Sequence, residues 1–188
     1  QRTALAKALI SLTGPLAAYA RQKQNNELLA DVYMSLSAIN TNDLMPSFTV
    51  DLLKREMPDL RGKHITILGI SYLNDVADTR YSPSELFYDL CEKEGAVMQL
   101  HDPLVSYWVE KAADVHTSID DLRGLKHDAA IFAVRHSDYL AMTAEQILSA
   151  LPGVSVIIDA FNIISDTTAQ ALRERGVKML GVGKGHWN

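Results

Sequence analysis

The sequence lacks several features that would point to particular classes of protein. It has a single cysteine, Cys91, so no disulfide can form within the chain. It has no secretory signal pattern and no uninterrupted apolar stretch long enough to span a membrane. We therefore expect a cytoplasmic protein with no membrane partner.

Positive charge is also scarce. The 18 lysines and arginines are outnumbered by 23 aspartates and glutamates, and no run of basic residues interrupts this balance. Nucleic acids attract clustered positive charge, so we expect no nucleic-acid partner. The histidines and the cysteine have no spacing typical of a metal site, and we expect no metal.

What the sequence does contain is typical of a globular protein. The chain has 188 residues, of which 47% are hydrophobic and 22% are charged, which suffices for one well-packed core. It begins at Gln1 and not at methionine. We therefore expect a piece of a longer protein.

Two regions, residues 1–60 and 61–188, meet at a turn-rich joint around residues 58–63. In the first, apolar residues at helical spacing predict one long helix, bent or broken around Met45 and Pro46, after a shorter helix near residues 16–22. The long helix carries an apolar stripe outside the second region. This stripe predicts a homodimer formed through the helical segment.

In the second region, short apolar runs alternate with helical patterns. This alternation predicts an α/β fold with a Rossmann-like, doubly wound parallel sheet. The expected strands are 64–68, 96–100, 129–134, 154–158 and 178–181, with a weak one at 115–116. The expected helices are 83–94, 104–113, 143–151 and 167–175.

The segment from Gly69 to Pro83 is the most informative stretch. It follows an apolar strand and ends in a Ser-x-x-Glu capping box, Ser82 to Glu85, with proline at the first helical position. Ligands of open α/β sheets bind beyond the carboxyl ends of strands, where such a loop lies. Arg80 in this loop is suited to hold a diphosphate, or else to form a salt bridge with Asp75 or Asp78.

Other candidates also follow strands, and each has a simpler interpretation. Tyr72 can stack on a base or only pack the loop, and Gly69 can admit a ligand or only permit a turn. Asp102 can contact a ligand or only make a strand-end turn. His136 should lie across from the first loop, as part of a site or of an ordinary polar loop. Cys91 has the helical spacing of a buried residue.

The order of these motifs resembles that of a known family. They are Gly69-x-x-Tyr72, Asp78-x-Arg80-x-Ser82-Pro83, Asp102-Pro103, Asp159-Ala160-Phe161-Asn162, Gly181-x-Gly183-x-Gly185 and the upstream stretch 38–46. Over about residues 15–188 the chain resembles the C-terminal nucleotide-sugar-binding domain of the UDP-glucose/GDP-mannose dehydrogenases. The resemblance implies a UDP-sugar or GDP-sugar as ligand. The candidate substrate-binding residues are Gly69, Tyr72, Asp78, Arg80, Ser82, Asp102, His136, Asp159 and Asn162.

The resemblance also implies what this chain does not supply. The family binds NAD on a separate N-terminal Rossmann domain and uses a catalytic cysteine, which would fall near Ile10 or Ser11, where the sequence has none. We therefore expect no catalytic residue and no bound NAD in this chain. Leu73 and Phe161 stand where the family has cationic residues, and Ala77 where it has an acidic one.

The resulting hypothesis is a nucleotide-sugar-binding C-terminal portion of an NAD-dependent nucleotide-sugar 6-dehydrogenase, of the type that makes UDP-uronates for polysaccharide biosynthesis. Such a portion would not be active alone. The alternatives are a degenerate binding module and a dimerisation scaffold without dehydrogenase activity.

Overall fold

The computed structural model describes residues 17–18 and 26–187. The chain divides between Met45 and Pro46 into two compact units. The long helix α2 runs from Asn26 to Glu56 without interruption and contains Pro46. The sequence suggested a bend or a break there, and a break is absent, although proline removes one backbone donor from the helix. The shorter helix expected at 16–22 lies outside the described residues, apart from helical residues 17 and 18.

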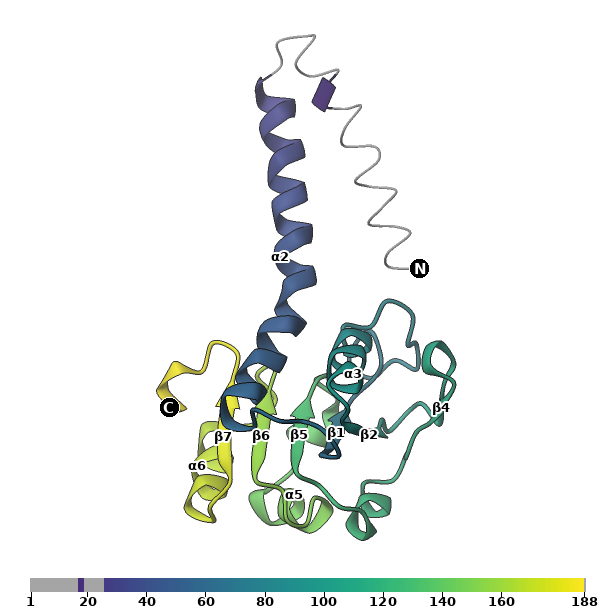
Figure 1. Cartoon of the computed structure of the whole chain (residues 1–188), viewed down its shortest axis with the longest axis vertical. Coiled ribbons are helices and arrows are strands. Elements are labelled where there is room, and N and C mark those ends of the chain that lie inside the picture. Colours follow the sequence, from purple (N-terminus) through teal and green to yellow (C-terminus); the bar gives the residue numbers. More distant parts are fainter. Residues whose placement is uncertain (1–16, 19–25, 188) are drawn as a thin grey trace. The chain divides into compact units, whose positions relative to one another are not determined.

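The second unit is built on five parallel strands in the order β2-β1-β5-β6-β7 (Figure 1). Their bounds are β1 His64–Leu68, β2 Val97–His101, β5 Ala129–Phe132, β6 Val156–Asp159 and β7 Lys178–Gly181. The expected Rossmann-like parallel sheet is therefore confirmed. The strand order reverses between β1 and β5, and this switch point is where such sheets bind ligands.

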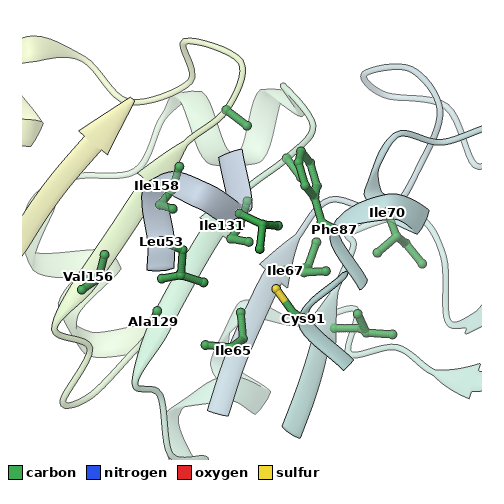
Figure 2. Packing of buried hydrophobic residues seen from close by; sticks show 14 of the residues in the cluster. Leu53, Ile65, Ile67, Ile70, Phe87, Cys91, Ala129, Ile131, Val156 and Ile158 are labelled. Atoms are coloured by element: carbon green, nitrogen blue, oxygen red, sulfur yellow. The ribbon is translucent and has the colours of Figure 1, made fainter. Parts of the chain in front are cut away.

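Helices cover both faces of the sheet, and each face has its own apolar cluster. On one face, the end of α2 and helix α3 (Ser84–Lys93) pack on the strands, and Figure 2 shows Leu53 of α2 over Ala129 and Ile131. On the other face, α5 (Ala144–Ala150) and α6 (Asp166–Glu174) bury a second cluster around Phe132. Cys91 is fully buried in the first cluster, as its spacing predicted, and burial raises the pKa of its thiol to about 12.

The helix predicted at residues 104–113 is wrong. An antiparallel ribbon of β3 (Tyr107–Trp108) and β4 (Ala113–Asp114) stands there, joined by the 3-10 turn η1 (Val109–Lys111). Ala112 turns the chain back in the left-handed conformation, at φ 48°, and Trp108 is fully buried against the edge of Tyr88. The weak strand expected at 115–116 is a single bridge between His101 and His116.

Three short helices complete the described chain: η2 (Ile119–Gly124), α4 (Ser137–Leu140) and η3 (Gly185–Trp187). The sequence had not predicted them, because three to six residues are too few to show a helical period. Among the described residues, no helix combines the length and the apolar character needed to cross a membrane.

Candidate functional site

The loop from Gly69 to Ser82 starts directly after β1 and passes against Val134, which follows β5. Gly69 has φ +94°, and a Cβ added to it would lie 2.5 Å from the Cβ of Val134. Its N–H donates to the carbonyl of His101, 2.8 Å away at the end of β2. Glycine is therefore required here because another part of the chain approaches it, whether or not a ligand does.

A single buried carboxylate holds the beginning of this loop. Oδ2 of Asp102, just after β2, accepts hydrogen bonds from the N–H groups of Ile70 and Ser71 at 2.9 and 3.0 Å, and from the Ser71 hydroxyl at 2.9 Å. Its Oδ1 accepts from the N–H of Leu104 at 3.0 Å. Since these donors occupy Oδ2 and one position on Oδ1 of a fully buried side chain, the geometry supports a positioning role for this residue.

His136, between β5 and α4, connects this carboxylate to the middle of the loop. Its Nε2 lies 3.2 Å from Oδ2 of Asp102, and its Nδ1 accepts the N–H of Asp75 at 2.9 Å. The Asp75 carboxylate accepts in turn from the N–H and hydroxyl of Ser137, at 2.9 and 2.7 Å. We call Asp75, Asp102, His136 and Ser137 the loop latch. It confirms that the segment after β5 lies across from the first loop.

The hydrogen bonds of the loop latch define the protonation state of His136. A ring nitrogen that accepts an N–H carries no proton, so the imidazole is neutral and donates through Nε2 to Asp102. Burial opposes a positive charge on this ring, but the carboxylates of Asp102 and Asp75 raise the pKa of His136 above its ordinary value overall. Protonation at Nδ1 would remove the acceptor that holds Asp75. The loop latch is therefore sensitive to protonation of one side chain.

Arg80 forms the salt bridge that the sequence left open as an alternative. Its guanidinium donates two hydrogen bonds to the Asp78 carboxylate, at 2.9 and 2.7 Å. The backbone N–H of Arg80 donates to the same carboxylate at 3.0 Å. These bonds lower the pKa of Asp78 to about 2. Asp59 and Arg61, which precede β1 in the chain, show the same arrangement. Most of the Arg80 side chain remains exposed and available to an anion.

Ser82 and Ser84 close the loop, and the predicted capping box is absent. The Ser82 hydroxyl donates to the carbonyl of Ser71 at 3.0 Å and accepts the N–H of Ser84 at 3.2 Å, whereas Pro83 is the cap residue without a side-chain bond. The Ser84 hydroxyl donates to the carbonyl of Gly69 at 2.8 Å. Both serines are fully buried, so they fasten the two ends of the loop together.

Asp159, at the end of β6, holds a second loop. Its two oxygens accept from the N–H groups of Phe161, Ile163 and Ile164, at 2.9 to 3.2 Å. Asn162 is exposed and left-handed, with φ 56°. Phe161 projects from this loop and is 47% exposed. As with Asp102, the hydrogen bonds of Asp159 support a positioning role.

Exposed groups on the first loop could contact a ligand directly. Tyr72 is 48% exposed and Leu73 is 52% exposed, and both come from the same loop as Arg80. An aromatic face, an apolar side chain and a guanidinium suit a base or sugar together with a phosphate. Ligand contact by the nine candidate residues remains a prediction. Asp75 was expected only as a partner for Arg80. It adopts the left-handed conformation, at φ 57°, which aspartate tolerates better than most residues.

The loop does not fit the diphosphate of NAD in the usual dinucleotide manner. That manner uses glycines whose backbone amides face the phosphates at a helix start. Here the amides of Ile70 and Ser71 are bonded to Asp102, and the amide of Ser84 is bonded to Ser82. Among the residues that the structure describes, no group of three or more histidine, cysteine or acidic side chains is placed to hold a metal.

These features define a Rossmann-like α/β domain whose candidate site lies on loops at the carboxyl ends of β1, β2, β5 and β6. Residues 66–166 match the family model described as "UDP-glucose/GDP-mannose dehydrogenase family, UDP binding domain". The chain belongs to this family.

Named relatives and a solved structure agree with the family. The chain is 28% identical to a UDP-N-acetyl-D-mannosamine dehydrogenase of Methanococcus aeolicus over 78% of its length, which is 33% of that protein. It is 28% identical to a UDP-glucose 6-dehydrogenase of Rickettsia bellii, over 72% of this chain and 32% of the relative. An NDP-N-acetyl-D-galactosaminuronic acid dehydrogenase from Methanosarcina mazei has a similar structure, with TM-score 0.68 and 27% identity over 81% of this chain and 31% of its own. The chain thus spans about a third of the length of these proteins.

Proposed function

We propose that this chain is the nucleotide-sugar-binding portion of an NAD-dependent UDP-sugar 6-dehydrogenase. In this proposal the loop from Gly69 to Ser82 contacts the nucleotide diphosphate of a UDP-sugar through Arg80. Tyr72 provides a face for the base or sugar. The carboxylates of Asp102 and Asp159 keep the two loops in place without touching the ligand.

The observation that carries this proposal is the loop latch. It ties together the loops after β1, β2 and β5 through short hydrogen bonds, at the switch point where α/β sheets bind ligands. A pre-formed loop loses little conformational freedom when a ligand arrives. The exposed Arg80 then offers a planar cation that can move from Asp78 to a phosphate.

Hydride transfer and covalent chemistry belong to the rest of the enzyme in this proposal. NAD, when bound, would accept hydride from the sugar C6 alcohol, and we assign its binding to a part outside this chain because the Gly69 loop does not fit it. The chain alone is then inactive as a dehydrogenase. The relatives' names contain UDP, which favours a UDP-sugar over a GDP-sugar.

The test is calorimetric titration of UDP into the chain and three variants. We expect Arg80→Ala to weaken UDP binding about three- to tenfold. This is less than the loss of a fully buried ion pair would cost, because Arg80 is exposed and already paired with Asp78. Leu73→Lys should tighten binding by a similar factor, since it returns a cation to a loop position facing the diphosphate. Arg61→Ala is the matched control, because Arg61 has the same two-pronged contact with Asp59 outside the loop.

The proposal fails if UDP gives no heat with any variant, including Leu73→Lys. It also fails if Arg61→Ala weakens binding as much as Arg80→Ala, since a general loss of positive charge would then explain both. GDP titrated in parallel shows whether the base contributes to selection.

A further inference from the structure

Within the loop latch, one contact of His136 depends on the protonation of the ring and the other does not. Nε2 donates to the buried carboxylate of Asp102, 3.2 Å away, and it carries a hydrogen whether the ring is neutral or charged. Nδ1 accepts the N–H of Asp75 at 2.9 Å, which requires a nitrogen without a proton. The contact with Asp102 therefore stays the same on protonation, whereas the contact with Asp75 must change.

A new partner for a protonated ring already lies beside Nδ1. Oδ1 of the Asp75 carboxylate is 3.6 Å from Nδ1, just beyond hydrogen-bond distance. At present this carboxylate is held by Ser137, whose N–H donates to Oδ1 at 2.9 Å and whose hydroxyl donates to Oδ2 at 2.7 Å. The Asp75 side chain is about half exposed and has room to turn. A small rotation brings Oδ1 from the Ser137 N–H to a proton on Nδ1.

The backbone of Asp75 depends on the hydrogen bond that protonation removes. Its φ of 57° is the left-handed conformation, which is unfavourable for a residue with a Cβ. Such a conformation persists where the surrounding contacts hold it. Leu73 and Val76 on either side are about half exposed, so packing gives this segment little support. Loss of the acceptor on His136 therefore allows the turn at Asp75 to relax.

The charges that face the ring allow it to gain a proton while its neighbours keep their own states. Burial opposes a charge on His136, but the carboxylates of Asp102 and Asp75 raise the pKa of the ring overall. Hydrogen bonds from Ser137 lower the pKa of Asp75, and donors around Asp102 lower its pKa despite burial. Tyr139, whose ring packs on the imidazole, stays neutral because burial raises the pKa of its hydroxyl. His136 is thus the group of this cluster that titrates near neutral pH.

We propose that the loop latch is a proton-operated switch with two states. In the neutral state, Nδ1 of His136 accepts the Asp75 N–H and Ser137 holds the Asp75 carboxylate. In the protonated state, Nδ1–H donates to that carboxylate, and the Asp75 backbone leaves its left-handed turn. The loop from Gly69 to Ser82 changes shape between the two states.

The switch has a consequence for the ligand, which rests on the proposed function. Asp75 lies between Tyr72 and Arg80 on one loop, and these two residues are the proposed contacts to a UDP-sugar. Relaxation of the turn moves them relative to each other. A ligand that fits the neutral state then binds less tightly as the pH falls, because part of its affinity is spent on restoring that state.

The first experiment is an NMR titration of the labelled chain between about pH 5 and 8, without ligand. It follows the ring nitrogens of His136 and the amides of Asp75 and Ser137. We expect the three residues to titrate with one common midpoint, because one proton changes all three contacts. The nitrogen shifts of the ring show directly that Nδ1 changes from acceptor to donor.

Two variants and a matched control test the assignment. Asp75→Asn should lower the His136 midpoint by about 0.5–1 pH unit, because it removes a facing carboxylate and keeps the backbone N–H. His136→Gln should abolish the titration of the Asp75 amide. His64→Gln makes the same substitution at the start of β1, at the opposite end of the strand from the loop, and should leave the titration unchanged. If His136→Gln does not fold, Asp75→Asn decides the matter.

The second experiment is calorimetric titration of UDP-glucose at about pH 5.5 and about pH 8. Its diphosphate gains no proton in this range, so the ligand itself does not change. We expect affinity to be about three- to tenfold lower at the acid pH. Linkage requires the reciprocal effect, so saturating UDP-glucose should lower the His136 midpoint by up to about one pH unit.

The switch is overturned if the Asp75 and Ser137 amides do not follow the His136 midpoint, or if Asp75→Asn leaves that midpoint unchanged. Equal affinity for UDP-glucose at both pH values would overturn the link between the switch and the ligand. If the three residues titrate together and UDP-glucose binds at neither pH, the proposed function fails and the switch stands.

Discussion

Asp102 shows how one side chain can determine the conformation of a loop. It lies fully buried and accepts bonds from three backbone N–H groups and a hydroxyl, and it faces the Nε2 of His136. Burial alone would raise the pKa of Asp102, but these donors, His136 first among them, lower it below its ordinary value overall. The carboxylate therefore stabilises the fold above the pKa of the unfolded chain, and this contribution is lost as pH falls through the folded value.

Replacing this carboxylate by an amide should be costly. In Asp102→Asn, one side of the side chain becomes a donor and faces other donors, so we expect the free energy of unfolding to fall by about 2–4 kcal/mol. Urea unfolding followed by circular dichroism measures this change. Asp59→Asn is the control, because Asp59 is exposed and bonds only to Arg61 among the contacts described above. Equal effects of the two substitutions would contradict the role assigned to Asp102.

The sequence predicted where these residues lie, but not which hydrogen bonds their side chains make. Asp102, His136 and Asp159 all follow predicted strands, and the carboxyl ends of parallel strands meet at one edge, so their proximity could be predicted. That the oxygens of Asp102 and Asp159 are occupied by loop N–H groups could not, because those bonds depend on the backbone path of each loop. For the same reason the pairing of Arg80 with Asp78 remained one of two alternatives.

At the scale of elements, the periodicity of apolar residues predicted the longer strands and helices, but it did not predict the short elements. The alternation of apolar runs and helical patterns predicted the five parallel strands, the helices α3, α5 and α6, and one long helix before the sheet. The β3–β4 ribbon pairs only two residues on each side, and so short a pattern has no period to recognise. What fixes it is burial of Trp108 against Tyr88, which is a tertiary contact.

The loop latch joins three strand ends, and its dependence on pH follows from His136. The groups that face this ring are the carboxylates of Asp102 and Asp75 and the ring of Tyr139. Because the pKa of His136 is raised above 6.5 in the folded chain, its contribution to stability is fully present below the unfolded pKa. That contribution is lost as pH rises through the folded value.

We therefore predict that His136→Gln lowers the free energy of unfolding, and that it lowers it more at pH 6 than at pH 8. The difference should not exceed about 1.4 kcal/mol for each pH unit, the limit for one proton. Urea unfolding at a series of pH values measures it. Protonated Nδ1 also cannot accept the Asp75 N–H, so hydrogen exchange of that amide, corrected for pH, should be faster at pH 6. A stability difference independent of pH would refute this account of His136.

At the scale of the whole molecule, two apolar clusters hold the sheet from both faces, while large apolar side chains remain exposed on α2. Met34 is 71% exposed, Met45 is 41% exposed and Phe48 is 46% exposed. Met34 and Met45, both in the first unit, are 11 positions apart, close to three helical turns. These two side chains thus project from similar sides of the helix. Exposed apolar residues aligned in this way favour an interface.

We propose that the chain forms the homodimer that the sequence predicted, and the exposed apolar residues of α2 support this proposal. We expect light scattering at micromolar concentration to give twice the chain mass of 20.8 kDa. The double substitution Met34→Glu with Met45→Glu should return the mass to that of one chain, because like charges would then meet across a two-fold axis. Val109→Glu is the matched control, since Val109 is equally apolar and exposed but lies outside α2. A monomeric unaltered chain would disprove the dimer, and a dimer broken by Val109→Glu would place the interface elsewhere.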